Sequence, residues 1–160
     1  MEDGRVVYHI NETGPTGPKA IAETVVLKRW KKRIKPGWRF SGARISPNFW
    51  RAMKVAFPDI EAVCARGDVD ALRLAIDAHR DELRKRKFSL PGAECVHVLL
   101  KILGPNRARQ LMDRHNDPRR ADRYGTPDLL LYAERVEGGG APYLRFVEVK
   151  KPREPLSSDQ

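Results

Sequence analysis

Two apolar, β-favouring runs in the C-terminal part of the sequence constrain the fold more than any other feature. They cover residues 128–133 and 143–149, and the glycine-rich segment 137–140 separates them. This pattern predicts a β-hairpin whose loop is longer than two residues. Both runs are apolar at consecutive positions, which favours strands covered on both faces. The chain should therefore contain a sheet with other parts of the molecule packed on each side.

The predicted hairpin brings three charged residues together. If the runs pair antiparallel about a turn centred between residues 138 and 139, Asp128 lies opposite Glu148 or Lys150. Glu148 and Lys150 are two positions apart, so they project from one face, and side chains directly opposite across a strand pair have Cβ atoms about 5 Å apart. Burying an unpaired charge is costly. These residues should therefore compensate one another or bind a cation.

The sequence before residue 89 is predicted to be largely helical. Apolar periodicity, the stop at Pro36-Gly37 and the capping residues Ser46 and Asp68 indicate helices over residues 19–35, 48–56 and 68–87. Two further helices are expected over residues 91–103 and 107–115, with a break at Gly104-Pro105. A short β-favouring run covers residues 6–10.

Composition favours a polyanionic partner. The 160 residues include 31 Lys and Arg against 21 Asp and Glu, which gives a net charge of +10. Nucleic acid and anionic membranes both attract such a surface. No apolar run approaches the roughly 20 residues of a membrane span. We therefore expect nucleic acid, and no membrane, as the partner.

Targeting and cysteine patterns favour a cytoplasmic protein. The first 20 residues lack the apolar core of a secretion signal. Cys64 and Cys95 stand singly, without the spacing of a zinc site or a disulfide framework. A reducing compartment is therefore expected.

Three short motifs occur in order near the predicted hairpin. They are Gly125-Thr126-Pro127-Asp128-Leu129, Glu148-Val149-Lys150 and Leu156-Ser157-Ser158-Asp159-Gln160. In combination they resemble the VRR-NUC branch of the PD-(D/E)XK nucleases, over residues 89–160. A lone Glu-x-Lys is usually a solvated strand face, so the ordered set carries the resemblance. It implies an α/β (α+β) fold: a restriction-endonuclease-like mixed sheet flanked by helices, preceded by a basic, mostly helical region over residues 1–88.

The resemblance also implies a metal-dependent deoxyribonuclease, with branched or free-ended DNA as expected substrates and DNA preferred over RNA. Asp128, Glu148 and the Val149 carbonyl would hold one or two Mg²⁺ or Mn²⁺ ions. Lys150 would orient the attacking water or stabilise the transition-state charge.

Two further residues are matched to the family pattern. Gln160 would support the site from its rim, and Glu94, near the start of the 91–103 helix, is matched to the family's upstream acid. A first-turn glutamate is equally explained by the helix dipole, and Glu82 and Asp113 are weaker substitutes for this role.

The sequence departs from the family pattern after Gln160, where the family continues into a helix and another strand. Either a continuing C-terminal segment completes the sheet, or a second copy or a partner chain completes it with help from residues 6–10. The alternative function is a nucleic-acid-binding module with an inactive or incomplete nuclease core.

Basic residues interleaved with tryptophans predict nucleic-acid contacts. One group surrounds Trp30 and a second precedes the hairpin: Lys28, Arg29, Lys31, Lys32 and Arg33, then Arg119, Arg120 and Arg123. Such interleaving suits phosphate contacts and base stacking. Trp30, Trp38 and Trp50 are equally well explained as core residues.

Overall fold

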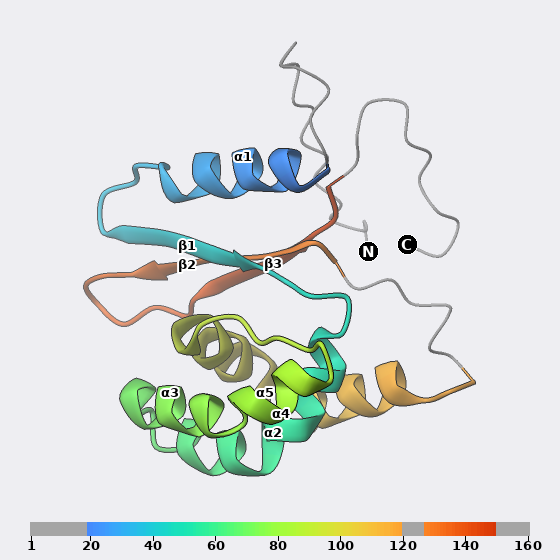
Figure 1. Ribbon diagram of the computed structural model, residues 1–160. Helices are drawn as coiled ribbons and strands as arrows, with labels where there is room; N and C mark the ends of the chain where they lie inside the picture. Colours follow the sequence, from blue (N-terminus) through green and yellow to red (C-terminus); the bar gives the residue numbers. More distant parts are fainter. Residues whose placement is uncertain (1–18, 120–126, 150–160) are drawn as a thin grey trace.

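The computed structural model describes residues 19–119 and 127–149, and it has a mixed α+β fold (Figure 1). The elements are α1 (Lys19–Lys31), β1 (Trp38–Arg44), α2 (Phe49–Cys64), α3 (Val69–Ala78), α4 (Arg80–Lys85), α5 (Ala93–Asn116), β2 (Leu129–Arg135) and β3 (Tyr143–Val147). The three strands form an antiparallel sheet in the order β1-β2-β3. The predicted strand over residues 6–10 lies outside the described residues.

The hairpin formed by β2 and β3 confirms the prediction from the two apolar runs. Leu129 pairs with Val147 and Ala133 pairs with Tyr143. Gly138 and Gly139 in the connecting loop have φ angles of +82° and +57°, in the left-handed region that glycine adopts at little cost. The glycine-rich segment therefore lets the chain reverse between the strands.

The central strand β2 is covered on both faces, as predicted. Leu130 and Tyr132 belong to the larger core, which α2 and α5 build on one face. Leu129, Leu131 and Ala133 belong to a smaller cluster with Trp30 of α1 on the other face. Figure 1 shows α1 lying over one side of the sheet and α2 to α5 over the opposite side. The alternating side chains of one apolar strand thus join two separate layers.

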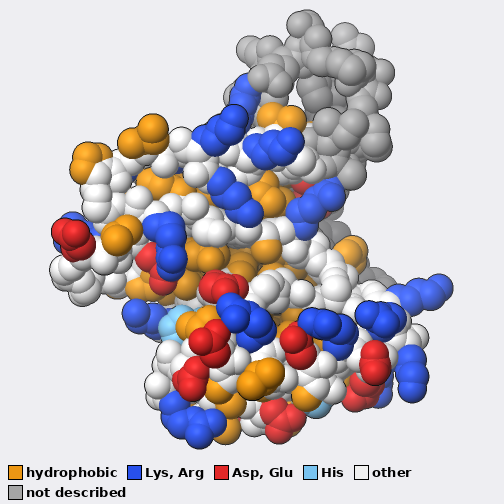
Figure 2. Space-filling view, turned by 60° about the vertical axis from the view of Figure 1, so that its left-hand side comes forward, with side chains coloured by type: hydrophobic (Ala, Val, Ile, Leu, Met, Phe, Trp, Pro, Cys, Tyr) orange, Lys and Arg blue, Asp and Glu red, His pale blue; other side chains and the backbone are white. Residues whose placement is uncertain are grey.

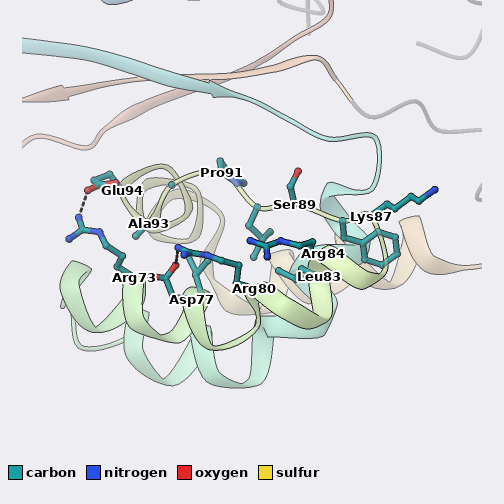
Figure 3. A pocket seen from close by; sticks show the side chains of 14 residues that line it. Arg73, Asp77, Arg80, Leu83, Arg84, Lys87, Ser89, Pro91, Ala93 and Glu94 are labelled. Carbon is teal, nitrogen blue, oxygen red and sulfur yellow. Dashed lines mark hydrogen bonds and ion pairs between the residues drawn. The ribbon is translucent and has the colours of Figure 1, made fainter.

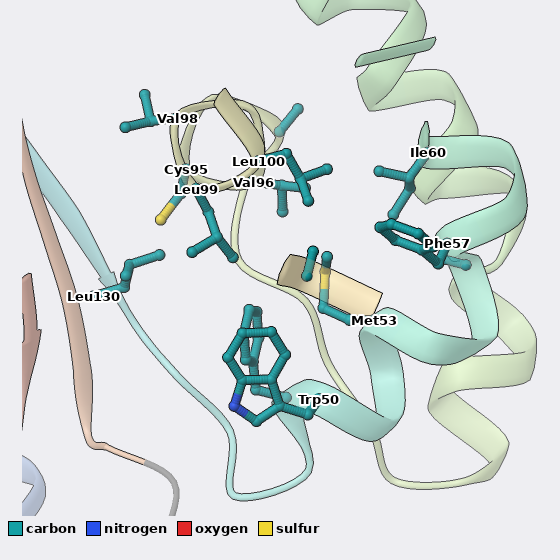
Figure 4. Close-up of a cluster of buried hydrophobic side chains, with 14 of the residues drawn as sticks. Trp50, Met53, Phe57, Ile60, Cys95, Val96, Val98, Leu99, Leu100 and Leu130 are labelled. Atoms are coloured by element: carbon teal, nitrogen blue, oxygen red, sulfur yellow. The ribbon is translucent and has the colours of Figure 1, made fainter. Parts of the chain in front are cut away.

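The larger core is aliphatic and aromatic throughout. Side chains of α2 pack against those of α5, and Leu130 of the sheet packs against the same cluster (Figure 4). Fully or almost fully buried members include Met53, Ile60, Val96, Leu99 and Leu130. Burial of such a side chain contributes roughly 1.5–3 kcal/mol, so this layer supplies most of the packing that holds the helices to the sheet.

Strand β1 corrects the sequence analysis, which predicts no strand between residues 36 and 46. Trp38 and Phe40 alternate with polar residues and pack against the Trp30 cluster. Gly42 is needed for close strand contact, because a Cβ there would lie 2.6 Å from the Leu130 carbonyl oxygen. Since β1 pairs with β2, the sheet combines chain from both sides of residue 88.

Helix boundaries also differ from the predictions. Helix α1 ends at Lys31, before the expected residue 35, while α2 continues through Pro58 to Cys64 instead of ending at residue 56. A proline removes one helical hydrogen bond, and packing of residues such as Ile60 outweighs that loss.

The capping residues give a mixed result. Asp68 caps α3 as predicted, because its carboxylate accepts a hydrogen bond from the Ala71 N–H at 2.9 Å. The expected 68–87 helix is divided at His79 into α3 and α4. Helix α2 begins at Phe49 with Asn48 at the N-cap, two residues after Ser46.

Helix α5 has the break predicted at Gly104-Pro105. Gly104 has a non-helical backbone, with φ 71° and ψ 160°. Helical segments therefore lie on each side of a kink. Among the described residues, no helix is both long enough and apolar enough to cross a membrane.

Candidate functional site

The hairpin brings Asp128 and Glu148 to the same end of the sheet. The β2–β3 register pairs Leu129 with Val147, and continuing it by one position beyond the strands places Asp128 opposite Glu148. On the other side, the Asp128 carbonyl accepts a hydrogen bond from the Ile45 N–H at 2.9 Å. Both acidic residues are half-buried. Two carboxylates thus lie on adjacent chain segments where the described sheet ends.

One oxygen of the Asp128 carboxylate is held by the opposite chain segment. Oδ2 accepts a hydrogen bond from the Val149 N–H at 2.8 Å. Val149 is itself buried against the Trp30 cluster beneath α1. Because this bond anchors Asp128 to a buried position, it limits the orientations of the carboxylate.

An aromatic group lies on the sheet face that carries Glu148. Glu148 and Phe146 are two positions apart and so share that face. The Trp50 ring centroid lies 6.2 Å from Phe146 and 5.5 Å from His115, on which it stacks. Burial, and secondly the charge of Arg114, lower the pKa of His115. His115 is therefore neutral at neutral pH and forms an uncharged wall with Trp50.

Glu94 lies in a different part of the molecule. It occupies the first turn of α5, where its Oε1 pairs with Nη2 of Arg73 at 2.6 Å (Figure 3). A hydrogen bond from its own backbone N–H, then the bond from Arg73, lower the pKa of Glu94. The charge of Arg39 also acts on this carboxylate, and Arg39 pairs with Glu134 near the far end of β2.

The length of β2 separates Glu94 from the hairpin carboxylates. From Leu129 to Glu134 the strand rises about 17 Å. The structure therefore does not bring Glu94 together with Asp128 and Glu148. Its position agrees with the structural explanation, in which a negative charge stabilises the start of a helix.

The two acidic residues considered as weaker candidates for the role of Glu94 also form ion pairs away from the hairpin. Glu82 pairs with Arg86 and Asp113 pairs with Lys54. Within the ranges 19–119 and 127–149, no group of three or more His, Cys, Asp or Glu side chains is arranged to hold a metal ion. The available oxygen donors at the hairpin are thus two carboxylates and backbone carbonyls.

Several predicted site residues fall outside the described residues. They are Lys150, Gln160, Arg120 and Arg123. Arg119 is described: it is exposed just beyond α5, and its backbone N–H bonds to the Asp117 carboxylate at 2.9 Å.

The predicted basic residues around Trp30 are exposed, while two of the three tryptophans are core residues. Lys28, Arg29, Lys31, Lys32 and Arg33 are all exposed. Trp30 is buried, and its indole N–H donates to the carbonyl oxygens of Ser41 and Tyr132 at 2.8 and 3.1 Å. Trp50 is also buried, and Trp38 is half-buried. The core explanation therefore holds for Trp30 and Trp50.

A cavity of about 530 Å³ lies between α3, α4 and residues 88–92. Figure 3 shows Arg80 and Arg84 of α4 beside it and Glu94 at its far side. Arg80 is paired with Asp77, so the lining combines both signs of charge. No motif of the sequence indicates this cavity, because its walls come from separate elements.

Comparison of the chain with protein-family models, with curated proteins and with solved structures found no match. Functional assignment therefore rests on the residues and their geometry.

Proposed function

We propose that this protein is a metal-dependent nuclease that hydrolyses phosphodiester bonds in DNA. The cross-strand placement of Asp128 and Glu148 at the end of the hairpin carries the proposal. The VRR-NUC resemblance of the same segments supports it independently of the coordinates. A restriction-endonuclease-like core is part of the proposal, and the α+β arrangement with helices on both faces of the sheet is compatible with it.

The donor atoms at the hairpin fit Mg²⁺ or Mn²⁺. Mg²⁺ prefers oxygen and commonly uses one or two carboxylates, with waters and substrate phosphates completing its coordination. Asp128 and Glu148 supply two carboxylates, and the Val149 carbonyl is the proposed third protein donor. When bound, the ion would polarise the scissile phosphate and increase the acidity of a water molecule.

The chain's own residues would position the reactants. The Val149 N–H holds Oδ2 of Asp128, and the strand register, continued by one position, would place Glu148 opposite it. The rings of Trp50 and His115 lie on the sheet face that carries Glu148 and would exclude water from that side, which would strengthen charge interactions nearby. Lys150, as the resemblance implies, would orient the attacking water or stabilise the extra negative charge of the transition state.

Completion of the sheet also belongs to the proposal. Among the described strands, β1 and β3 each have only one neighbour. A second copy of the chain is proposed to extend the core.

The test is cleavage of labelled single-stranded, duplex, flap and four-way-junction DNA with Mg²⁺ or Mn²⁺. Asp128→Asn and Glu148→Gln remove negative charge with little change of shape, and the amide oxygen introduced by Asp128→Asn still accepts the Val149 hydrogen bond. We expect each to lower the cleavage rate at least about a hundredfold. Asp113→Asn, which alters an exposed carboxylate paired with Lys54, is the matched control and should cut normally. Cleavage that survives chelation or both site substitutions would contradict the proposal.

The second candidate function is a nucleic-acid-binding module with an inactive nuclease core. The engagement of Glu94 with Arg73, about a strand length from the hairpin carboxylates, favours it. Metal-independent binding of DNA without cleavage of any of the four substrates would support this function over the first.

A further inference from the structure

Arginines on the helical side of the molecule are paired with carboxylates. Arg73 pairs with Asp70 and Glu94, and Arg80 pairs with Asp77. Further along, Arg84 lies near Asp81 and Arg86 pairs with Glu82. Positive charge on α3 and α4 is therefore largely balanced locally.

At the opposite end of the sheet from Asp128, cations lie over aromatic rings instead. The Arg33 guanidinium is 4.9 Å from the Trp30 ring centroid, and that of Arg145 is 4.7 Å from Tyr143. Trp38 has two such neighbours, Lys35 at 4.7 Å and Arg135 at 5.5 Å. We call this the cation–aromatic surface, defined by Arg33, Lys35, Trp38, Arg135, Tyr143 and Arg145.

The parts of this surface are joined by backbone and ring contacts. Trp38 and Arg135 are cross-strand partners, and the Val136 N–H donates to the Gly37 carbonyl at 2.9 Å. Trp30 and Tyr143 stack with centroids 6.4 Å apart. The surface is therefore continuous from the turn after α1 to the start of β3.

Three cations of this surface have no carboxylate partner in the described part of the chain. Within residues 19–119 and 127–149, Lys35, Arg135 and Arg145 form no ion pair with a carboxylate. In Figure 2 blue and red side chains alternate over the lower, helical part, whereas blue predominates in the upper part. A cation over a ring keeps its full charge and is held in place.

Such cations suit a phosphate backbone. A guanidinium stacked on a ring still presents its N–H groups at its edge, where they can donate to phosphate oxygens. Because the stack already restricts the side chain, less conformational entropy is lost on binding. Tyr143 is 36% exposed and adds a ring beside these cations, which suits a strand with unpaired bases.

We propose that the cation–aromatic surface binds a single-stranded segment of nucleic acid that continues around the edge strand β3 to Glu148. Tyr143 and Arg145 face α1, whereas Glu148 projects from the opposite face. The segment therefore crosses the edge of β3, which has only one neighbour among the described strands. Tyr143 lies five positions before Glu148, or about 17 Å along the strand. An unpaired strand can extend beyond the roughly 3.4 Å per nucleotide of a duplex strand, so this length corresponds to at most about five nucleotides. This spacing rests on the proposed nuclease function, whereas binding itself does not.

Binding is tested without catalysis, by fluorescence anisotropy of a labelled 20-nucleotide single strand with the Asp128→Asn protein. Combining Lys35→Gln, Arg135→Gln and Arg145→Gln should weaken binding at least tenfold. The slope of log affinity against log salt should fall by about 2, because three phosphate contacts are lost. The matched control is Arg80→Gln with Arg84→Gln, which removes two cations that have carboxylate neighbours and should change affinity less than twofold. Unchanged binding by the triple variant, or equal weakening by the control, would overturn the inference.

Sedimentation with lipid vesicles distinguishes nucleic acid from an anionic membrane as the ligand of this surface. Ile34 and Val136 are 96% and 67% exposed beside these cations, as an anionic membrane contact would require. We expect no sedimentation with vesicles containing 30% anionic lipid. Sedimentation that the triple variant loses, with single-strand binding unchanged, would assign the surface to lipid and overturn the proposal.

Cleavage distinguishes this inference from the proposed function. On substrates with ten nucleotides on the side of the cleaved bond that runs towards Tyr143, the triple variant should show a raised KM. On substrates with only one nucleotide on that side, which cannot reach Tyr143, its KM should match that of the protein with the unaltered surface. If DNA is cut but KM is unchanged on long substrates, the inference fails and the nuclease stands. If nothing is cut but the triple variant loses binding, the nuclease fails and the inference stands.

Discussion

The two faces of the sheet differ in how they are covered. On one face α2 and α5 form a broad core of aliphatic and aromatic side chains, with no buried polar side chain recorded for the described residues. On the other face α1 contributes a narrow cluster around Trp30, which combines ring packing with two hydrogen bonds to the sheet. The broad face supplies most of the packing, whereas on the narrow face Tyr143 of β3 stays partly exposed.

The largest expected effect compares two leucines on opposite faces of β2. Leu130 and Leu131 are both almost completely buried, the first in the broad core and the second in the Trp30 cluster. Leu130→Ala should lower the free energy of unfolding by about 4 kcal/mol and Leu131→Ala by about 2.5 kcal/mol. Urea unfolding measures both. Equal losses, or a larger loss at Leu131, would contradict the difference between the faces.

Next in size is the hydrogen bonding of Trp30. Trp30→Phe keeps a ring but removes the indole N–H that bonds to Ser41 and Tyr132. We expect a loss of about 2 kcal/mol in the free energy of unfolding. Trp38→Phe is the control, because Trp38 is half-buried and should cost less. If both substitutions cost the same, α1 is held by ring packing alone.

A smaller, stabilising effect is expected at the rim of the broad face. Lys87, two residues after the end of α4, has a φ angle of +56°. Next to it, the Phe88 N–H bonds to the Leu83 carbonyl at 2.8 Å. Glycine adopts this conformation without a Cβ penalty, so Lys87→Gly should raise the free energy of unfolding by about 0.7 kcal/mol. Lys85→Gly, inside the same helix, should instead be destabilising. Thermal unfolding midpoints of the two variants measure this difference. If Lys87→Gly lowers the midpoint, the Lys87 side chain itself stabilises the fold.

The smallest effect concerns pH and Glu94. The folded state lowers the pKa of this carboxyl through its own backbone N–H and Arg73. A lowered pKa stabilises the fold above the unfolded value of 4.5, and that contribution disappears as pH falls through the folded pKa. Because the side chain is half exposed, the contribution should be only a few tenths of a kcal/mol. Glu94→Gln should therefore reduce the difference in the free energy of unfolding between pH 7 and pH 3. If that difference is unchanged, the Glu94–Arg73 pair does not contribute to it.

The hairpin was predictable because its signals are local. Consecutive apolar residues, a glycine-rich loop and simple pairing arithmetic predict that Asp128 lies opposite Glu148 or Lys150. Strand β1 was not predictable in this way: Arg39, Ser41 and Gly42 weaken its β signal, and its stability comes from pairing with β2. Tertiary packing overrides local preference there.

The positions of side chains that depend on how the helices pack could not be predicted from the sequence either. Glu94 does lie in the first turn of α5, as expected, but the packing of α5 decides which end of the sheet it faces. Burial of Trp30 and Trp50 follows from contacts with segments distant in sequence. The cation–aromatic surface likewise joins residues 33–38 to residues 135–145.

The strand order has a consequence for biosynthesis. Trp38 pairs with Arg135, which is translated 97 residues later, while β2 and β3 are neighbours in the chain. At about 5–20 residues per second, β1 waits about 5–20 seconds for its partner strand to be made. During that interval its backbone N–H and carbonyl groups can pair with other nascent chains. The arginines at positions 39 and 44 of this strand would then repel like strands and delay aggregation until β2 emerges.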